Sequence, residues 1–351
     1  MLNVYVIGCG GIGGYLIDRL PMVISSLSLD LAQQAGLDIQ HYLDAAGTVA
    51  YPCIVDNLVF VDGDVFNPRN AMRQGMGAGS KLAQRMISVM KSIKQGLDSR
   101  DAVADSLRFL KKTSEDAKKL KSPLEIKEAV DILMDDRHLT EDYMQALQSE
   151  MVRVSCLQSM KLIGYNEYIR PSNFKEIMPE VRSGEVRQDT AGILDKLAGE
   201  PRKRLSSNTV VFLGVDNAKT RYEVCKYMES FRNCLVINGG NSKTEGQVNV
   251  YERQDGKALD PQLFELYPDI SPDADRRPDE MACTVIAPSH DQIAVTNSLI
   301  ADVMLSKFIR WVRYGLDEMK RNGVVRYNEV IVNSDKFSTM SLYHPLKPKG
   351  E

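Results

Sequence analysis

Residues 4–20 read VYVIGCGGIGGYLIDRL, an apolar run followed at once by a glycine-rich turn and a helical pattern. Gly8, Gly10 and Gly13 give the spacing G-x-G-x-x-G, with Gly11 inside the same turn. The first glycine of such a turn permits a tight reversal, the second lets a phosphate approach the backbone, and the third allows close helix–strand packing. Because a helix N-terminus also favours negative charge, this stretch predicts a nucleotide-phosphate site in an α/β fold.

Further along the chain, apolar runs with strand character alternate with helical patterns. The run at residues 58–61 is followed by Asp62 and Asp64. Its long separation in sequence from the glycine turn is explained if an extra helix occupies about residues 21–56. We therefore expect a Rossmann-like, doubly wound α/β sheet, parallel in its first half and antiparallel in its C-terminal strands. The later elements are expected at residues 210–213, 234–237 and 247–251 for strands, 293–314 for a helix, and 326–342 for a two-stranded ribbon.

The middle of the chain has a different character, with charged helical patterns between about Gln95 and Ser206. These patterns predict an inserted helical region rather than a part of the sheet. The expected division is a nucleotide-binding half at 1–94, the insertion at 95–206, and a second half at 207–351 with a magnesium site, a crossover loop and the ribbon.

The residues after the second strand, VDGDVFNPRNAMRQ at 61–74, favour a triphosphate ligand. Arg73 offers a fork of donors that neutralises phosphate charge, while Asn70 and Gln74 can hydrogen-bond phosphate oxygens. Lys81 starts the next helical stretch, from which a flexible cation can reach the same phosphates. An NAD-dependent oxidoreductase, which the glycine turn alone also allows, has no need for these groups beyond its ribose-binding acid, Asp62.

A second chemical motif is VVFLGVDNAKTR at residues 210–221, where a buried strand ends in Asp216. Ligands of α/β sheets bind at the carboxyl edge of the strands, so this carboxylate is well placed to hold Mg²⁺ against phosphates. The alternative is that Asp216 caps the helix that starts near Ala218, and the two roles are compatible.

Together these motifs resemble the ThiF–MoeB–HesA family, which includes the ubiquitin-activating enzymes. The family pattern is a glycine turn, then D-x-D, then an Asn six residues later that is followed by x-x-R-Q. The resemblance covers residues 1–20, 57–93 and 207–342. It rests on Asp62, Asp64, Asn70, Arg73 and Gln74, on Lys81, on Asp216, Asn217 and Arg221 as D-N-x-x-x-R, on VINGGNSKTEGQVNVY at 236–251, and on CTVIAP at 283–288.

The resemblance implies that the protein binds ATP and Mg²⁺ and adenylates a carboxylate. This carboxylate is usually that of the C-terminal glycine of a ubiquitin-like or sulfur-carrier protein, or the C-terminal carboxylate of a peptide. It assigns Asp62 to the ribose, Asn70, Arg73 and Lys81 to the phosphates, and Asp216 to the metal. It also implies a homodimer. The nucleotide-binding set expected overall is Gly8, Gly10, Gly11, Gly13, Asp62, Asp64, Asn70, Arg73, Gln74, Lys81 and Asn217.

The sequence departs from the family pattern at several points. No Cys-x-x-Cys pair is present, so no zinc is expected, and the arginine that many members contribute from an N-terminal helix has no counterpart before the first strand. Cys283 lies where some relatives place a reactive cysteine, and its thiolate could take the acyl group as a thioester; the alternative is a small buried residue before a helix. Cys9, Cys225 and Cys234 are interpreted as packing positions.

Composition narrows the functional classes. The chain of 351 residues is 43% hydrophobic and 26% charged, with a formal net charge of −3. This balance gives no broad attraction to nucleic acid or acidic membranes, and no apolar run approaches the roughly 20 residues of a membrane span. The expectation is a cytoplasmic adenylyltransferase with neither nucleic acid nor membrane as a partner. A catalytically inactive scaffold of the same fold stays open as an alternative.

Overall fold

The structure, a computed structural model, describes residues 2–34, 53–65, 79–94, 157, 160–180, 208–242, 244–275, 294–321 and 327–346. Within these residues the strands form one nine-stranded mixed sheet, with the spatial order β3-β2-β1-β4-β5-β6-β8-β9 and β7 paired to β6.

The first half of this sheet is parallel. It comprises β1 (Leu2–Ile7), β2 (Val55–Val61), β3 (Lys161–Tyr165), β4 (Asn208–Leu213) and β5 (Cys234–Asn241). β1 lies between β2 and β4, so the chain builds outward from β1 in both directions. In such sheets the crevice beyond the carboxyl ends of the central strands is the usual ligand site.

The second half is antiparallel. β6 (Glu245–Gln254) pairs with β5, β8 (Glu329–Asn333) pairs with β6, and β9 (Ser338–Leu342) forms the far edge, while the short β7 (Lys257–Ala258) pairs with the end of β6. The expected fold class, a Rossmann-like sheet that changes from parallel to antiparallel pairing, is confirmed. The predicted C-terminal ribbon is also confirmed.

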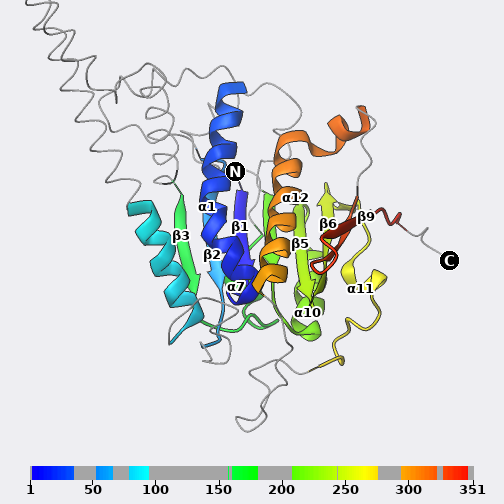
Figure 1. Ribbon diagram of the computed structural model, residues 1–351, viewed down its shortest axis with the longest axis horizontal. Helices are drawn as coiled ribbons and strands as arrows, with labels where there is room; N and C mark the ends of the chain where they lie inside the picture. The colour runs from blue at the N-terminus through cyan, green and yellow to red at the C-terminus, as the bar shows by residue number, and fades with distance from the viewer. Residues whose placement is uncertain are drawn as a thin grey trace, which may run out of the picture.

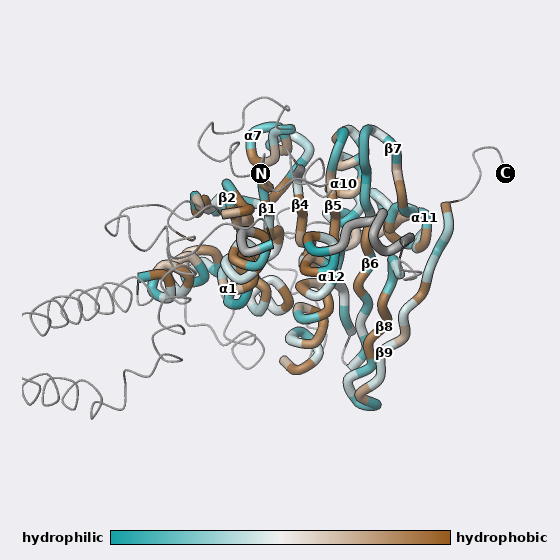
Figure 2. Tube along the Cα trace, turned by 90° about the horizontal axis from the view of Figure 1, so that it is seen from above, coloured by the Kyte–Doolittle hydropathy of each residue, from teal (hydrophilic) through white to brown (hydrophobic). Residues whose placement is uncertain are grey.

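Helices cover both faces of the sheet. α1 (Gly11–Gln34) and α12 (Ala294–Arg321) lie on one face, and α7 (Phe174–Ile177), α10 (Ala218–Met228) and α11 (Leu263–Leu266) lie on the other (Figures 1 and 2). Residues 81–94 form a further helix, whose buried Leu82 and Val89 join the core on the α1 side.

The sheet has a hydrophobic core on each of its two faces. The same strands contribute to both cores, because successive side chains of a strand point to opposite faces. In β1, Val4 and Val6 pack beneath α1 and α12, whereas Tyr5 and Ile7 pack against the α10 side. All four are at most 3% exposed, which explains why this strand reads as a continuous apolar run.

One expectation about the N-terminal helix is wrong. The sequence predicts an extra helix within about residues 21–56, but residues 21–34 continue α1, which runs unbroken from Gly11 to Gln34 with Pro21 inside it. Residues 35–52 lie outside the described residues. Pro21 cannot donate a hydrogen bond to the carbonyl of Ile17. The buried stripe formed by Ile17, Leu20, Ile24, Leu27 and Leu31 crosses the proline at three- and four-residue spacing, and its burial outweighs that loss.

The interpretation of residues 95–206 as lying outside the sheet is wrong for Lys161–Tyr165. These residues form β3, parallel to β2 at the sheet edge. An edge strand with one covered face has intermediate and exposed side chains, so it carries little of the apolar signal by which buried strands are recognised. The rest of this region is described only at 157, 160 and 166–180, and the domain division stays a prediction.

In the described part of the chain, no helix is long and apolar enough to cross a membrane.

Candidate functional site

The carboxyl ends of β1, β2 and β4 bring together the glycine turn, Asp62 and Asp216. Gly8 N–H donates to the Val61 carbonyl over 2.9 Å, and Gly214 N–H donates to the Ile7 carbonyl over 2.9 Å. The turns that leave the three strands are therefore tied to one another at the edge where α/β sheets bind their ligands.

The glycine turn is packed too tightly for side chains. Gly8 has φ of +88°, and a Cβ there would lie 2.9 Å from the Gly214 carbonyl oxygen. A Cβ at Gly13 would overlap the Gly8 carbonyl oxygen, and one at Gly11 would lie 2.6 Å from Nδ2 of Asn297. These glycines thus let the turn, α1 and α12 close on one another, as the G-x-G-x-x-G spacing predicts.

Asp62 holds the glycine turn at the end of β2. Its carboxylate accepts hydrogen bonds from the backbone N–H of Cys9 at 2.6 Å and of Asp64 at 2.7 Å, one on each oxygen. Burial raises the pKa of Asp62, and this effect outweighs Lys81 and the two N–H groups, which lower it. Because a carboxylate has about four lone-pair positions, Asp62 keeps acceptor capacity for ribose hydroxyls.

Lys81 lies beside this turn, as expected, but it is paired within the protein. Its Nζ forms an ion pair with Asp64, and the residue is 7% exposed. Burial lowers the pKa of Lys81, but the carboxylates of Asp64, Asp62 and Asp216 outweigh it, so the pKa lies above its ordinary value. The site therefore holds a protonated lysine between acidic groups of two strand ends.

Asp216 is exposed at the carboxyl end of β4. The cap of α10 is not Asp216 but Asn217, whose Oδ1 accepts from the Thr220 N–H over 2.8 Å. The capping alternative for Asp216 is therefore wrong, and Asn217, expected to bind nucleotide, has its side-chain oxygen engaged in the helix.

Arg221 explains the D-N-x-x-x-R spacing. One helical turn after Asn217, its guanidinium folds back so that Nη2 donates to the Val215 carbonyl and Nη1 donates to Asn238 Oδ1 at 2.6 Å. Burial lowers the pKa of Arg221, while Asp216 and Asp275 act in the opposite direction. We call these two contacts the Arg221 brace, because they fix the residue that precedes Asp216 to β5.

Sequence reasoning missed several polar residues around this site. Asp275 accepts hydrogen bonds from the first N–H groups of α10, those of Ala218 and Lys219, at 3.0 Å each. Asn297 of α12 lies against Gly11 and accepts from Asn241 Nδ2 over 2.7 Å. Each contact joins residues more than fifty positions apart in the sequence, so no local sequence pattern predicts it.

A second cation was also overlooked. The guanidinium of Arg85 lies over the first turn of α1, where a Cβ on Gly14 would overlap it, and Nη1 pairs with Asp18 at 2.9 Å. No local pattern marks Arg85 as a site residue, because its contacts are to the distant first helix. Its side chain adds positive charge near the glycine turn.

Four expected site residues, Asn70, Arg73, Gln74 and Cys283, lie outside the described residues, and their roles stay predictions. The interpretation of the other cysteines as core positions is confirmed. Cys9, Cys225 and Cys234 are at most 2% exposed, and burial raises the pKa of each thiol, to about 12 for Cys225 and Cys234.

The arrangement fits an anionic, hydroxyl-bearing ligand better than a tightly caged metal. Among the described residues, no group of three or more His, Cys, Asp or Glu side chains is arranged to hold a metal ion. Asp216 is a single exposed carboxylate, which suits a hydrated Mg²⁺ that takes its remaining ligands from phosphates and water. The glycine turn lies at the N-terminus of α1, where backbone N–H groups can bind an anion.

Comparisons with known proteins identify no family for this chain. No protein-family model and no curated protein matches the sequence. Solved structures of low identity do match over 99% of this chain: the Microcin C7 biosynthetic enzyme MccB in complex with N-formylated MccA (TM-score 0.43, 11% identity, 66% of that chain) and Escherichia coli MccB with ATP (TM-score 0.42, 11% identity, 65% of that chain). PaaA matches with a TM-score of 0.37 and 12% identity, over 98% of this chain and 64% of that one. This chain therefore spans slightly less than two thirds of the length of these structures.

Proposed function

We propose that the protein adenylates the C-terminal carboxylate of a peptide or of a ubiquitin-like or sulfur-carrier protein, with ATP as co-substrate. The observation that carries the proposal is the convergence of the glycine turn, Asp62, Lys81 and Asp216 at one sheet edge. The family resemblance of the D-x-D, R-Q and D-N-x-x-x-R motifs supports it independently.

Each residue has a physical role in this reaction. The backbone N–H groups of the glycine turn and of the N-terminus of α1 donate hydrogen bonds to phosphate oxygens, and Asp62 accepts hydrogen bonds from the ribose hydroxyls. Lys81, together with Arg73, neutralises the phosphate chain. Mg²⁺, held by Asp216, would supply further charge neutralisation. The Arg221 brace fixes the position of Asp216.

The chemistry needs positioning and charge compensation rather than a general base. A carboxylate oxygen of the substrate attacks the α-phosphorus, an acyl–oxygen–phosphorus bond forms, and the bond to the pyrophosphate leaving group breaks. The attacking group is already ionised near neutral pH, so no proton is abstracted. Because nucleophile and electrophile are both anionic, fixed cations contribute most by reducing their repulsion. In a further step, the Cys283 thiolate would attack the carbonyl carbon of the acyl adenylate, so that a thioester forms while the bond to AMP breaks and AMP leaves.

The test is ATP–pyrophosphate exchange with Mg²⁺ and a set of C-terminal peptides and carrier proteins. Asp216→Asn should reduce the exchange rate by at least about 100-fold, because a charged metal ligand is replaced by a neutral one. Asp335→Asn, in the exposed turn between β8 and β9, is the matched control and should leave the rate unchanged.

Three outcomes would count against the proposal. Exchange that survives Asp216→Asn would remove Asp216 from the metal site. Binding of NAD without binding of ATP, measured by calorimetry on the wild type, would favour an oxidoreductase, whereas ATP binding without exchange for any carboxylate substrate would favour an inactive scaffold of the same fold.

A further inference from the structure

A row of buried polar side chains crosses the antiparallel part of the sheet on the α10 side. Asn238 of β5 lies directly opposite Asn249 of β6, and Asn249 lies directly opposite Glu329 of β8. Residues opposite one another share a face of the sheet, and these three are 2%, 4% and 1% exposed. We call them the polar row. Buried polar groups in mid-sheet are unfavourable unless they are hydrogen-bonded, so the row requires an explanation.

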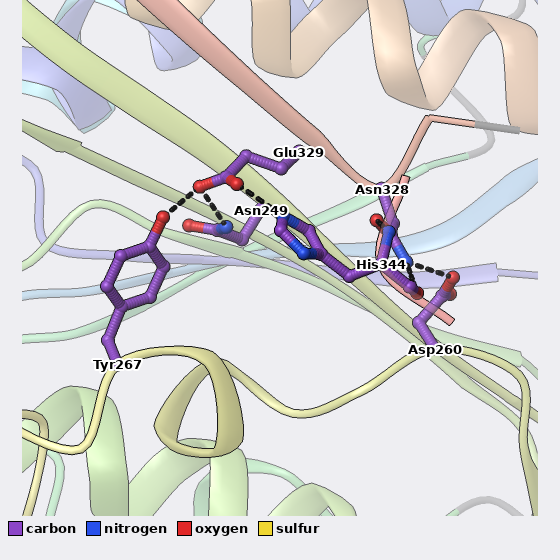
Figure 3. Close-up of polar contacts among 6 residues, drawn as sticks. All are labelled: Asn249, Asp260, Tyr267, Asn328, Glu329 and His344. Atoms are coloured by element: carbon purple, nitrogen blue, oxygen red, sulfur yellow. Dashed lines mark hydrogen bonds and ion pairs between the residues drawn. The ribbon is translucent and has the colours of Figure 1, made fainter. Parts of the chain in front are cut away.

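The row ends on opposite charges. At one end, Asn238 Oδ1 accepts from Nη1 of Arg221, which is part of the Arg221 brace. At the other end, Glu329 is bonded to three side chains: Asn249 Nδ2 donates to it over 3.1 Å, the Tyr267 hydroxyl donates to the same oxygen, and His344 Nε2 lies 2.6 Å from its second oxygen (Figure 3). Burial and the neighbouring Glu329 raise the pKa of Tyr267 to about 12, which keeps the phenol protonated as a donor at neutral pH.

The charges at the two ends fix how both amides are oriented. A guanidinium only donates, so the oxygen of Asn238 must face Arg221 and its Nδ2 must point the other way. A carboxylate only accepts, so Nδ2 of Asn249 must face Glu329, and its Oδ1 is left free to accept elsewhere. The two amide atoms of the row that neither charge engages are thus one donor, Asn238 Nδ2, and one acceptor, Asn249 Oδ1.

These two atoms are buried and have no hydrogen-bond partner among the residues that the structure describes. Directly opposite residues in a sheet have Cβ atoms about 5 Å apart, so one small group that lies between or beside the two amides can reach both of them. Such a group must accept from Asn238 Nδ2 and donate to Asn249 Oδ1. Water satisfies both requirements, and buried waters characteristically join otherwise unpaired polar atoms.

We propose that one buried water joins Asn238 to Asn249, and that Asn249 and Glu329 are thereby positioning residues for the Asp216 turn. The effect passes from Glu329 through Asn249, the water and Asn238 to Arg221, which holds the Val215 carbonyl next to Asp216. The structural part of this proposal is independent of the proposed function; its consequence for Mg²⁺ binding rests on that function.

The structural part is tested by a high-resolution crystal structure of the protein. We expect one water within about 3.2 Å of both Asn238 Nδ2 and Asn249 Oδ1. In crystals of Asn249→Ala, the contact of Arg221 with Asn238 should be displaced and the turn at residues 215–217 should shift. A direct amide–amide bond in the wild type, or an unshifted turn in the variant, would overturn the proposal.

The functional part is tested by calorimetry of ATP binding with and without Mg²⁺. Asn249→Ala and the isosteric Glu329→Gln should weaken Mg-ATP binding about fivefold, while ATP without Mg²⁺ should bind as in the wild type. This difference separates positioning of Asp216 from general destabilisation, which would weaken both. Equal losses in both titrations, or no loss in either, would contradict the positioning role.

A matched control lies four residue pairs further along the same two strands. Asn333 of β8 also donates through Nδ2 to a glutamate of β6, Glu245, over 2.9 Å, but this pair is at the protein surface and lies outside the polar row. Asn333→Ala should change Mg-ATP affinity less than twofold. If the wild type binds no nucleotide at all, the proposed function fails, and the crystal structures alone decide on the polar row.

Discussion

At the scale of single residues, the glycine turn offers the sharpest test of the fold. A Cβ at Gly13 would overlap the Gly8 carbonyl oxygen, which belongs to the backbone and cannot rotate away. We expect Gly13→Ala to lower the free energy of unfolding by about 3 kcal/mol or more, measured by urea denaturation. Gly164→Ala is the control, because its Cβ would lie 3.4 Å from Leu82 and Met86, an ordinary contact, and should cost less than about 1 kcal/mol. Similar losses in both variants would show that the turn can relax.

At the scale of elements, α10 is the helix that most directly supports the candidate site. Asn217 caps it through the Thr220 N–H, and Arg221 ties it to β5. We expect Asn217→Ala to lower the free energy of unfolding by about 1 kcal/mol, because a buried N–H at the helix start loses its acceptor. Asn217→Ser keeps a capping oxygen and should cost only a few tenths of a kcal/mol. Equal losses in urea denaturation would mean that the cap contributes little.

Elements also show where sequence reasoning reaches its limit. Strands buried on both faces, such as β1 and β4, were predicted because their apolar runs are local and uninterrupted. The length of α1 could not be predicted in this way. Proline disfavours the interior of a helix through local geometry, whereas the packing that keeps Pro21 inside α1 comes from contacts with the whole sheet. β3 was missed because an edge strand has too few buried side chains to stand out from its charged surroundings.

At the scale of the whole molecule, the same distinction applies to the candidate site. Asp62, Lys81 and Asp216 could be predicted, since each follows directly from the end of a strand or the start of a helix. The brace from Arg221 to Asn238 and the contact of Asp275 with α10 could not, because both depend on strand register and on loops that return from distant positions. Motifs thus identify the charged groups, whereas the contacts that hold them in place emerge only from the assembled sheet.

The buried thiols and phenols make the stability of the whole molecule sensitive to alkali. The pKa values of Cys225 and Cys234 rise from 9.0 to about 12, with burial as the largest cause in each. In the unfolded chain these thiols lose their protons near pH 9, whereas the folded protein retains them to about pH 12. The unfolded state therefore binds fewer protons in this window, so their stabilising contribution is complete below about pH 9 and is lost as the pH rises toward 12.

Each cysteine should contribute up to about 1.4 kcal/mol per pH unit to this loss. Urea denaturation at several pH values from about 8 to 10.5 should thus show a shallower fall in the free energy of unfolding for Cys225→Ala than for the wild type. Val224→Ala, at the neighbouring and fully buried position of α10, removes apolar volume without a titrating group. This control should lower stability equally at every pH and keep the wild-type slope. An unchanged slope in Cys225→Ala would contradict this prediction, because it would mean that the thiol titrates alike in the folded and unfolded states.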